Sequence, residues 1–193
     1  MGTTAVSIPL PIRTRKKVLN YDDYVRLTPP DSGNYELHNG QIVYMPSPTP
    51  PHQRVTGYLF RKMADFAESN HLGEVFIAPL DTKFDAINTL QPDVLFISAG
   101  RTGMVTDKKI DGAPDLVVEV LSEGNSPKDM SFKKYIYESF EVREYWLVNL
   151  KKNTLTQYLN HDGEFVPKKV HQKNDVLRAE TLQGFELALD KLL

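Results

Sequence analysis

An apolar run that contains two acidic residues constrains the fold of this chain more than any other feature. Residues 114–122 read PDLVVEVLS, and successive side chains of a strand point to opposite faces. One face would be wholly apolar, which predicts a central strand of an α/β sheet, where an ionised carboxylate is unfavourable without a cation, a metal or several donors. Glu119 therefore needs a partner. The two faces are Leu116, Val118 and Val120, and Asp115, Val117, Glu119 and Leu121.

The residues that follow predict a helix and then a second strand. Ser126 is a suitable N-cap, Pro127 fits the first helical position, and Asp129 can reach back to the cap amide. We expect a helix over residues 127–140 and a strand over 144–149, with a right-handed crossover in a largely buried sheet. The helix would carry an apolar stripe of Phe132, Tyr135, Ile136 and Phe140, with Asp129, Lys133 and Tyr137 on a different face.

The length and the hydrophobic content bound the domain organisation. A chain of 193 residues with 40% hydrophobic residues can bury a real core. We expect a loose tail over residues 1–19 and one domain over residues 20–193. The tail carries a basic cluster that could touch nucleic acid, although a solvated terminus is the more ordinary interpretation. This cluster consists of Arg13, Arg15, Lys16 and Lys17.

The composition excludes several classes of function. The chain has no cysteine, so it has no disulfide, thiolate zinc site or cysteine nucleophile, and an oxygen-bound hard metal is the remaining metal option. The formal net charge of −2 does not indicate a uniformly basic surface, so any site for a polyanion must be local. No apolar run approaches the roughly 18 residues of a membrane span, and the N-terminus lacks a signal-peptide core. We therefore expect a cytoplasmic protein with no membrane partner.

Two polar residues lie near predicted turns in the first third of the chain. Residues 35–45 read YELHNGQIVYM, and Asn39 with Gly40 is a strong hairpin signal. Glu36 in this hairpin can face either solvent or a site, and solvent is the usual environment of a single strand glutamate. His52 follows a proline-rich loop and begins an amphipathic helix. It can be a polar cap, or it can bind a metal or a phosphate-bound water, because the helix dipole favours its neutral form.

A third acidic residue opens another apolar strand. Residues 91–98 read QPDVLFIS, so Asp93 precedes its strand much as Asp115 does. The carboxylate of Asp93 could simply accept hydrogen bonds from loop amides, which is the commoner role after proline. The C-terminal third predicts short antiparallel strands, and it contains no repeat and no glycine-rich phosphate loop.

Taken in order, these segments resemble the Uma-type family of restriction endonucleases within the PD-(D/E)XK nuclease superfamily. The resemblance covers roughly residues 20–190, through YELHNGQIV, the proline loop before His52, QPDVLFIS, PDLVVEVLS, the later Asp129 and Lys133, and EYWLVN. It implies a restriction-endonuclease-like α/β fold, with a central mixed sheet flanked by helices, an N-terminal hairpin and C-terminal antiparallel strands. It also implies Mg²⁺-dependent cleavage of phosphodiester bonds, with Mn²⁺ as a substitute and DNA favoured over RNA.

The resemblance assigns roles to residues of this chain. Asp93 and Glu119 would hold the metal, Glu36 would bind it through water or bind a second metal, and His52 would join the catalytic set. Leu121 stands where the motif has its lysine, and in this family the lysine is placed on the following helix, at Lys133. Without the resemblance, Asp129 and Lys133 would form an ordinary ion pair on the helix surface.

The residue types fit this chemistry, and they also leave a second function open. A divalent cation held by carboxylates lowers the pKa of the attacking water and neutralises charge at phosphorus, and Mg²⁺ needs only two or three carboxylates. The first function is a nuclease, expected to be a homodimer because one such site cuts one strand. The second is a non-catalytic nucleic-acid-binding or regulatory protein with the same fold, in which the dry charged pocket would have no purpose.

These hypotheses make geometric predictions. We expect Asp93, Asp115 and Glu119 on neighbouring central strands, with the carboxylates of Asp93 and Glu119 within about 6 Å so that they can share a cation. The ammonium of Lys133 should reach the pocket beside Leu121. Lys134 should instead face solvent near Glu138. Asp115 and Asp129 receive no role.

Overall fold

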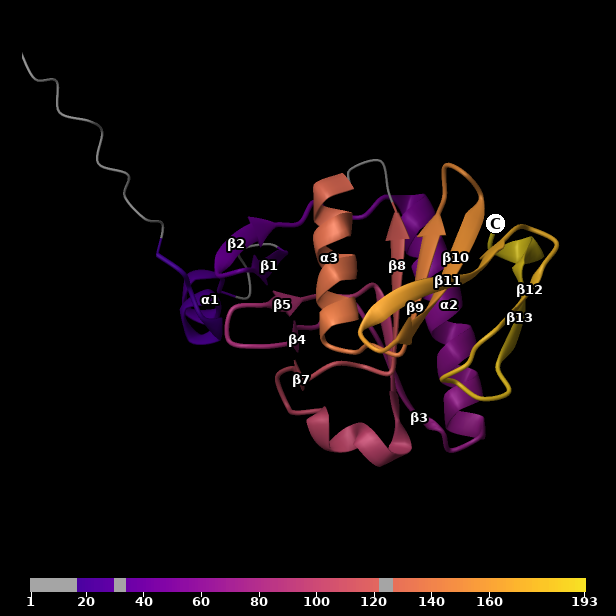
Figure 1. Cartoon of the computed structure of the whole chain (residues 1–193), viewed down its shortest axis with the longest axis horizontal. Coiled ribbons are helices and arrows are strands. Elements are labelled where there is room, and N and C mark those ends of the chain that lie inside the picture. Colours follow the sequence, from indigo (N-terminus) through magenta and orange to yellow (C-terminus); the bar gives the residue numbers. More distant parts are fainter. Residues whose placement is uncertain (1–16, 30–33, 122–126) are drawn as a thin grey trace, which may run out of the picture.

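The structure is a computed structural model that describes residues 17–29, 34–121 and 127–193 (Figure 1). In chain order its elements are α1 (Tyr21–Leu27), β1 (Tyr35–His38), β2 (Gln41–Tyr44), α2 (Pro50–Ser69), β3 (Gly73–Ile77), β4 (Thr82–Lys83), β5 (Thr89–Leu90), β6 (Val94–Ser98), the 3₁₀ helix η1 (Ala99–Met104), β7 (Ile110–Asp111), β8 (Leu116–Leu121), α3 (Pro127–Ser139), β9 (Glu144–Asn149), β10 (Thr154–His161), β11 (Glu164–His171), β12 (Val176–Arg178), β13 (Glu186–Ala188) and the 3₁₀ helix η2 (Leu189–Lys191).

The larger sheet is mixed, as predicted, and β8 lies inside it. Its strand order is β11-β10-β9-β8-β6-β3, with β8 parallel to β9 and antiparallel to β6. Helices cover both faces of this sheet, α3 on one and α2 on the other (Figure 1). The α/β fold class and the central position of the acid-bearing strand are therefore confirmed.

The two faces of β8 separate as the alternation predicts. Leu116, Val118 and Val120 pack in a core cluster with α2 and the C-terminal segment. Val117 packs in the other cluster, with Ile136 of α3. Glu119 shares the α3 side with Val117, so its carboxylate lies under a helix instead of in water.

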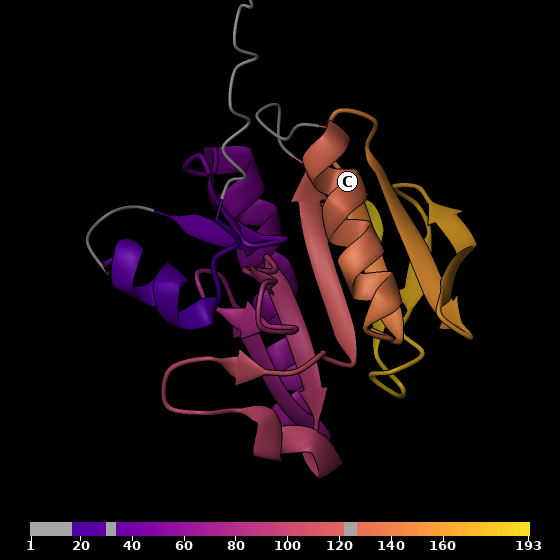
Figure 2. The same cartoon turned by 60° about the vertical axis from the view of Figure 1, so that its left-hand side comes forward.

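The N-terminal hairpin belongs to a smaller sheet with the strand order β2-β1-β5-β4-β7. Asn39 and Gly40 form its turn with φ values of 47° and 70°, which glycine adopts without steric cost. A Cβ at Gly40 would also lie only 2.9 Å from the carbonyl oxygen of Leu19. Figure 2 shows this hairpin and α1 on one side of the molecule, with β10–β13 on the other.

Helix α3 differs from its prediction in the face that it buries. It ends at Ser139, one residue before the predicted end, and Ser126 lies outside the described residues, as do residues 1–16 of the predicted tail. Tyr135 is 60% exposed, whereas Lys133 and Tyr137 are buried. The prediction of Tyr135 on a buried stripe is therefore wrong. The helix is rotated so that its polar face meets the buried carboxylates of the sheet, and that rotation turns Tyr135 outward.

Lys134 also differs from its prediction. It is half-buried, and its ammonium lies 4.8 Å from the ring centroid of Tyr158, so it does not simply face solvent. Glu138, its expected neighbour, instead accepts a hydrogen bond from the backbone N–H of Phe165 at 2.5 Å. The hairpin of β10 and β11 packs beside α3 and supplies both contacts.

None of the helices in the described ranges combines the length and the apolar character that crossing a bilayer requires.

Candidate active site

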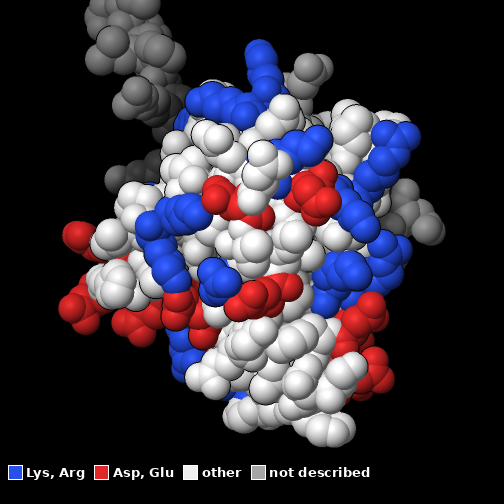
Figure 3. Space-filling view, turned by 90° about the vertical axis from the view of Figure 1, so that its right-hand side faces the viewer, with Lys and Arg blue, Asp and Glu red and all other residues white. Residues whose placement is uncertain are grey.

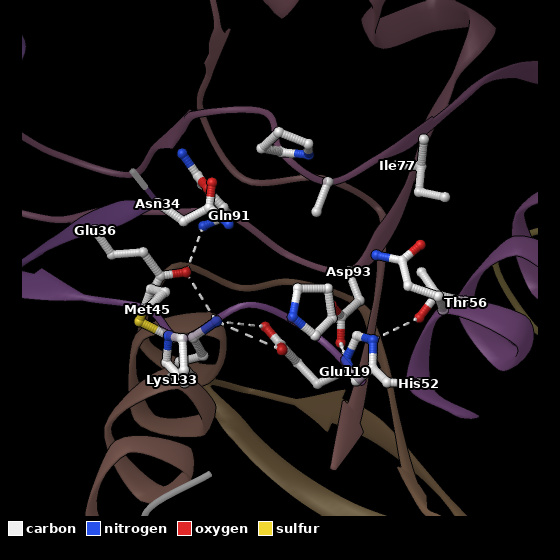
Figure 4. Close-up of a pocket in the computed structure, with 15 residues that line it drawn as sticks. Asn34, Glu36, Met45, His52, Thr56, Ile77, Gln91, Asp93, Glu119 and Lys133 are labelled. Atoms are coloured by element: carbon white, nitrogen blue, oxygen red, sulfur yellow. Dashed lines mark hydrogen bonds and ion pairs between the residues drawn. The ribbon is translucent and has the colours of Figure 1, made fainter. Parts of the chain in front are cut away.

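A cavity of about 180 Å³ brings together the five residues to which the sequence assigned a site. It lies between the β1–β2 hairpin, the start of α2, β6, β8 and α3, and Figure 4 shows the side chains pointing into it. The five are Glu36, His52, Asp93, Glu119 and Lys133, and they come from five different elements or their flanking residues. The tertiary structure therefore assembles one polar site from segments that are distant in sequence.

The pairing of β6 with β8 places the two motif carboxylates side by side. The register pairs Val94 with Val118 in antiparallel sense, so Asp93, one position before β6, lies opposite Glu119. Oδ2 of Asp93 accepts a hydrogen bond from the backbone N–H of Val120 at 2.7 Å. The role of loop-amide acceptor that the sequence left open for Asp93 thus exists, although the amide belongs to the neighbouring strand and lies inside the cavity.

Lys133 lies between two buried carboxylates. Its Nζ is 3.2 Å from Oε1 of Glu119 and 2.8 Å from Oε1 of Glu36. Glu36 is fully buried, so of the two environments that the sequence left open for it, it occupies the site and not solvent: the hairpin turns this face of β1 towards α3. Asp129 instead lies 3.5 Å from Nδ1 of His38, so the surface ion pair between Asp129 and Lys133 does not describe this helix.

Burial and neighbouring charge set the protonation of Glu119. Burial raises the pKa of its carboxyl to about 8, and the carboxylates of Asp93 and Glu36 add to this effect, while Lys133 opposes it. A hydrogen bond of 2.5 Å from the hydroxyl of Tyr137 also lowers the pKa. Glu119 is therefore a carboxyl that holds its proton near neutral pH unless another cation reaches the cavity.

Glu36, Glu119 and Lys133 form an ion cluster, and Lys133 and Glu36 are its charged members. Burial alone would lower the pKa of Lys133, but the carboxylates of Glu119 and Glu36 raise it well above its ordinary value. Burial alone would raise the pKa of Glu36, but Lys133 and His38 lower it. Glu36 accepts from Lys133, from His38 Nε2 at 2.7 Å and from the backbone N–H of Gln91 at 2.7 Å. These donors fix Glu36 as an anion that holds the ammonium beside Glu119.

His52 contacts the first carboxylate. Its Nε2 lies 3.1 Å from Oδ2 of Asp93, and its Nδ1 lies 3.3 Å from the hydroxyl of Thr56, one helical turn further along α2. Burial alone would lower the pKa of His52, but Asp93 raises it. His52 is therefore placed to orient Asp93. This contact does not fit the role of a simple polar cap, which was one of the two roles that the sequence left open.

Three further residues of the site received no role from the sequence. Tyr137 follows Lys133 by one helical turn, and His38 follows Glu36 by two positions on one strand face, so periodicity could have indicated both. Gln91 acts on Glu36 through its backbone N–H, and no sequence signal identifies such a donor.

Asp115 lies at the other end of the sheet from Asp93, because β6 and β8 are antiparallel. Both residues directly precede their strands, and these strands are neighbours, as predicted. Asp115 accepts from the backbone N–H of Ser98 at 2.8 Å and pairs with Arg101 at 2.8 Å and Arg143 at 3.1 Å. Asp115 therefore links this end of the sheet to Ser98, Arg101 and Arg143, and it does not line the cavity.

The donor set suits a small hard cation that keeps most of its waters. Within residues 17–29, 34–121 and 127–193, no group of three or more His, Asp or Glu side chains is arranged to hold a metal ion. Three carboxylates line the cavity, and because Glu36 is paired with Lys133, Asp93 and Glu119 are the two that could hold a cation. Mg²⁺ commonly binds through one or two carboxylates with several waters. The hydrogen bonds of Asp93 within the described residues use Oδ2, so Oδ1 can face a cation. A cation bound at Glu119 would also lower the raised pKa of this carboxyl, because the cation favours the ionised form.

Comparison with known proteins agrees with this fold. The crystal structure of a protein described as a putative nuclease belonging to DUF820, from Anabaena variabilis, superposes with a TM-score of 0.76 at 17% sequence identity. The match covers 90% of this chain and 97% of that one, and it supports the fold alone. No curated protein matches the sequence. The sequence model of one family, Uma2, described as "Putative restriction endonuclease", matches residues 21–190. With nearly the whole described chain inside that match, the protein belongs to the Uma2 family of restriction-endonuclease-like nucleases.

Proposed function

We propose that this protein is a divalent-cation-dependent endonuclease that hydrolyses phosphodiester bonds of DNA. The observation that carries the proposal is the ammonium of Lys133, 3.2 Å from Glu119, in the same cavity as Asp93. These are the three residue types of the PD-(D/E)XK motif, and here they meet although the lysine comes from the helix. A protein that only binds nucleic acid has no evident need to bury this ion cluster.

Each residue has a distinct task in the proposed reaction. Asp93 and Glu119 would hold Mg²⁺ or Mn²⁺, and the cation would supply positive charge at the phosphate and lower the pKa of the attacking water. Lys133 orients that water and stabilises the charge that develops on phosphate oxygens. Glu36 fixes the ammonium in position, and His52 fixes Asp93. Glu36 remains the candidate for a water-mediated or second metal contact.

The charge distribution supports a local contact with the polyanion. Figure 3 shows the side of the molecule that lies on the right in Figure 1, where Lys and Arg side chains alternate with Asp and Glu side chains. The net charge of the whole chain is −2. With so little net charge, contact with DNA would be local, at the cavity that holds Lys133. A homodimer would supply the second site for a duplex break.

The test is incubation of the purified protein with plasmid and with oligonucleotides in Mg²⁺ and in Mn²⁺. We expect cleavage that EDTA stops and that Glu119→Ala abolishes. Tyr135→Ala is the control, because Tyr135 lies on the exposed face of the same helix. Binding of DNA without cleavage in either metal would favour the non-catalytic alternative. Parallel assays with RNA determine whether DNA is the preferred substrate.

A further inference from the structure

A second cavity adjoins the candidate active site and has a different chemistry. Its volume is about 360 Å³, and it shares Asn34, Pro79 and Gln91 with the first cavity. Its other walls come from α1, β1 and the segment that contains Asp81. Tyr21, Tyr24, Tyr35, Asp81 and Lys108 are among the residues that line it. The two cavities therefore share a wall, and the second forms an aromatic compartment beside the site of Glu36, Glu119 and Lys133.

Asp81 is a half-buried carboxylate that lines this compartment. Its Oδ1 accepts from Gln91 Nε2 at 2.9 Å and from the hydroxyl of Tyr24 at 3.1 Å, and its Oδ2 lies 3.5 Å from the hydroxyl of Tyr21. Among the described residues no Lys or Arg forms an ion pair with it, and burial raises the pKa of its carboxyl. A carboxylate can accept about four hydrogen bonds, so Asp81 retains capacity towards the cavity.

The surroundings of Asp81 combine flat rings with cations. The ammonium of Lys109 lies 5.4 Å and that of Lys83 lies 5.9 Å from the ring centroid of Tyr21, and both also pair with the carboxylate of Asp111. Lys108 lines the cavity itself. Aromatic rings with nearby cations are the usual components of sites for unpaired nucleotides, in which bases stack and phosphates meet lysine. A carboxylate repels phosphate, so in such a site Asp81 has a favourable role only towards a base.

We propose that this cavity binds an unpaired base of the substrate strand next to the cleaved bond, and that Asp81 accepts a hydrogen bond from its exocyclic amino group. This inference rests on the proposed nuclease function. Carboxylates read the amino group of cytosine in this way, and adenine and guanine also carry an exocyclic amino group, whereas thymine carries none. Asp81 is thus a specificity-determining residue that selects amino-bearing bases over thymine.

Gln91 connects the two compartments. Its backbone N–H donates to Glu36 of the ion cluster at 2.7 Å, and its side-chain amide donates to Asp81 at 2.9 Å. One residue therefore fixes the distance between the carboxylate that would meet the base and the group that positions Lys133. The base read by Asp81 should accordingly lie at a constant position, within a few nucleotides of the cut.

The experiment measures which base lies at each position near the cleaved bond, instead of the total cleavage activity. Single-stranded DNA randomised around its centre is cleaved by the wild-type protein in Mn²⁺, and the ends are sequenced; a matching duplex pool is cut in parallel. A second arm sequences the strands bound by Glu119→Gln. We expect roughly fivefold or greater selection of cytosine, adenine or guanine over thymine at one position, and weaker selection in the duplex, whose bases are paired.

Asp81→Asn should abolish that selection, because an amide can also donate to thymine. Asp85→Asn is the matched control: Asp85 is also a half-buried carboxylate that accepts hydrogen bonds from its own loop, but it lines neither cavity. If Asp81 only supports Tyr24 and Gln91, Asp81→Asn will lower the cleavage rate equally for all four bases, or it will lower the melting temperature of the protein. In either case the base profile will be the same as that of the wild-type protein.

The two proposals fail in different ways. Cleavage with a uniform base profile in the wild-type protein overturns the base site and leaves the nuclease function intact. Selective binding by Glu119→Gln without cleavage by the wild-type protein overturns the nuclease function and leaves the base site intact. If no DNA is bound or cut, both are overturned.

Discussion

Nζ of Lys133 lies 3.2 Å from Oε1 of Glu119, so a residue of α3 places its ammonium beside the carboxylate of a central strand. The side chain of Lys133 is 3% exposed, and the carboxylate of Glu36 lies 2.8 Å from the same ammonium. Strand β8 ends with Leu121 at the motif's own lysine position. The packing of α3 across the sheet therefore supplies the positive charge that the strand lacks.

Replacing this lysine should remove cleavage more than it removes structure. We expect Lys133→Ala to lower the cleavage rate by roughly 10² to 10⁴-fold, because the group that orients the water and stabilises phosphate charge is lost. Lys134→Ala is the control and should keep its rate, since Lys134 contacts Tyr158 on another face. Rates are measured per folded protein, with folding checked by circular dichroism. Full cleavage by Lys133→Ala, in an assay that Glu119→Ala abolishes, would contradict the role of Lys133.

Metal binding should depend on Asp93. Calorimetry with Mn²⁺ should give a clear binding heat for the wild-type protein and little or none for Asp93→Ala, because the cavity then retains one motif carboxylate. Asp93→Ala also removes the acceptor for His52 and for the Val120 amide. Asp93→Asn, which keeps an acceptor oxygen, separates these effects. Unchanged Mn²⁺ binding by Asp93→Ala would show that the metal site is elsewhere.

The raised pKa of Glu119 predicts a dependence of stability on pH. Its folded-state pKa of about 8 exceeds the ordinary value of 4.5, so the protonated carboxyl favours folding at low pH. This contribution is lost as the pH rises from 4.5 to about 8. Without divalent cations, Glu119→Gln should therefore gain melting temperature over the wild-type protein between about pH 5 and pH 8, by at least roughly 2 °C.

Cation binding should reverse this penalty. Added Mn²⁺ should raise the melting temperature of the wild-type protein more at about pH 8 than at about pH 5, because the proton and the cation compete for Glu119. Glu119→Gln should show little of this difference. An equal shift at both pH values would indicate that Glu119 does not hold the cation.

Asp115 should act on stability alone. Burial would raise its pKa, but the Ser98 amide and Arg101 lower it, so its contribution is present above about 3.8 and is lost as the pH falls through the lower folded-state value. We expect Asp115→Asn to reduce the free energy of unfolding by roughly 1–3 kcal/mol at neutral pH, and by less in acid. Urea denaturation measures both.

The control for this prediction is Asp111→Asn, because the Asp111 side chain is 48% exposed and should contribute little. Cleavage per folded Asp115→Asn molecule should equal that of the wild-type protein, since Asp115 lies at the opposite end of β8 from the cavity. A selective loss of cleavage would mean that Asp115 reaches the site.

Local sequence patterns determined several parts of this protein. The period of two in PDLVVEVLS was enough to identify a buried central strand and to show that Glu119 needs a partner. Asn39 with Gly40 was enough for the hairpin, because few residues adopt its positive φ angles. The motif resemblance supplied Asp93 and Lys133 as candidates, which composition and spacing alone left as a loop acceptor and a surface ion pair.

Only the tertiary structure decided which faces are buried and which distant groups meet. Periodicity shows which residues share a helix face, but the rotation of α3 that buries Lys133 and exposes Tyr135 depends on the carboxylates beneath it. Glu36 and Gln91, 55 positions apart, and Asp93 and Val120, 27 positions apart, meet through strand pairing and packing. Such contacts depend on the free energy of the whole fold, because burying a charge is tolerable only where its partners arrive from other segments.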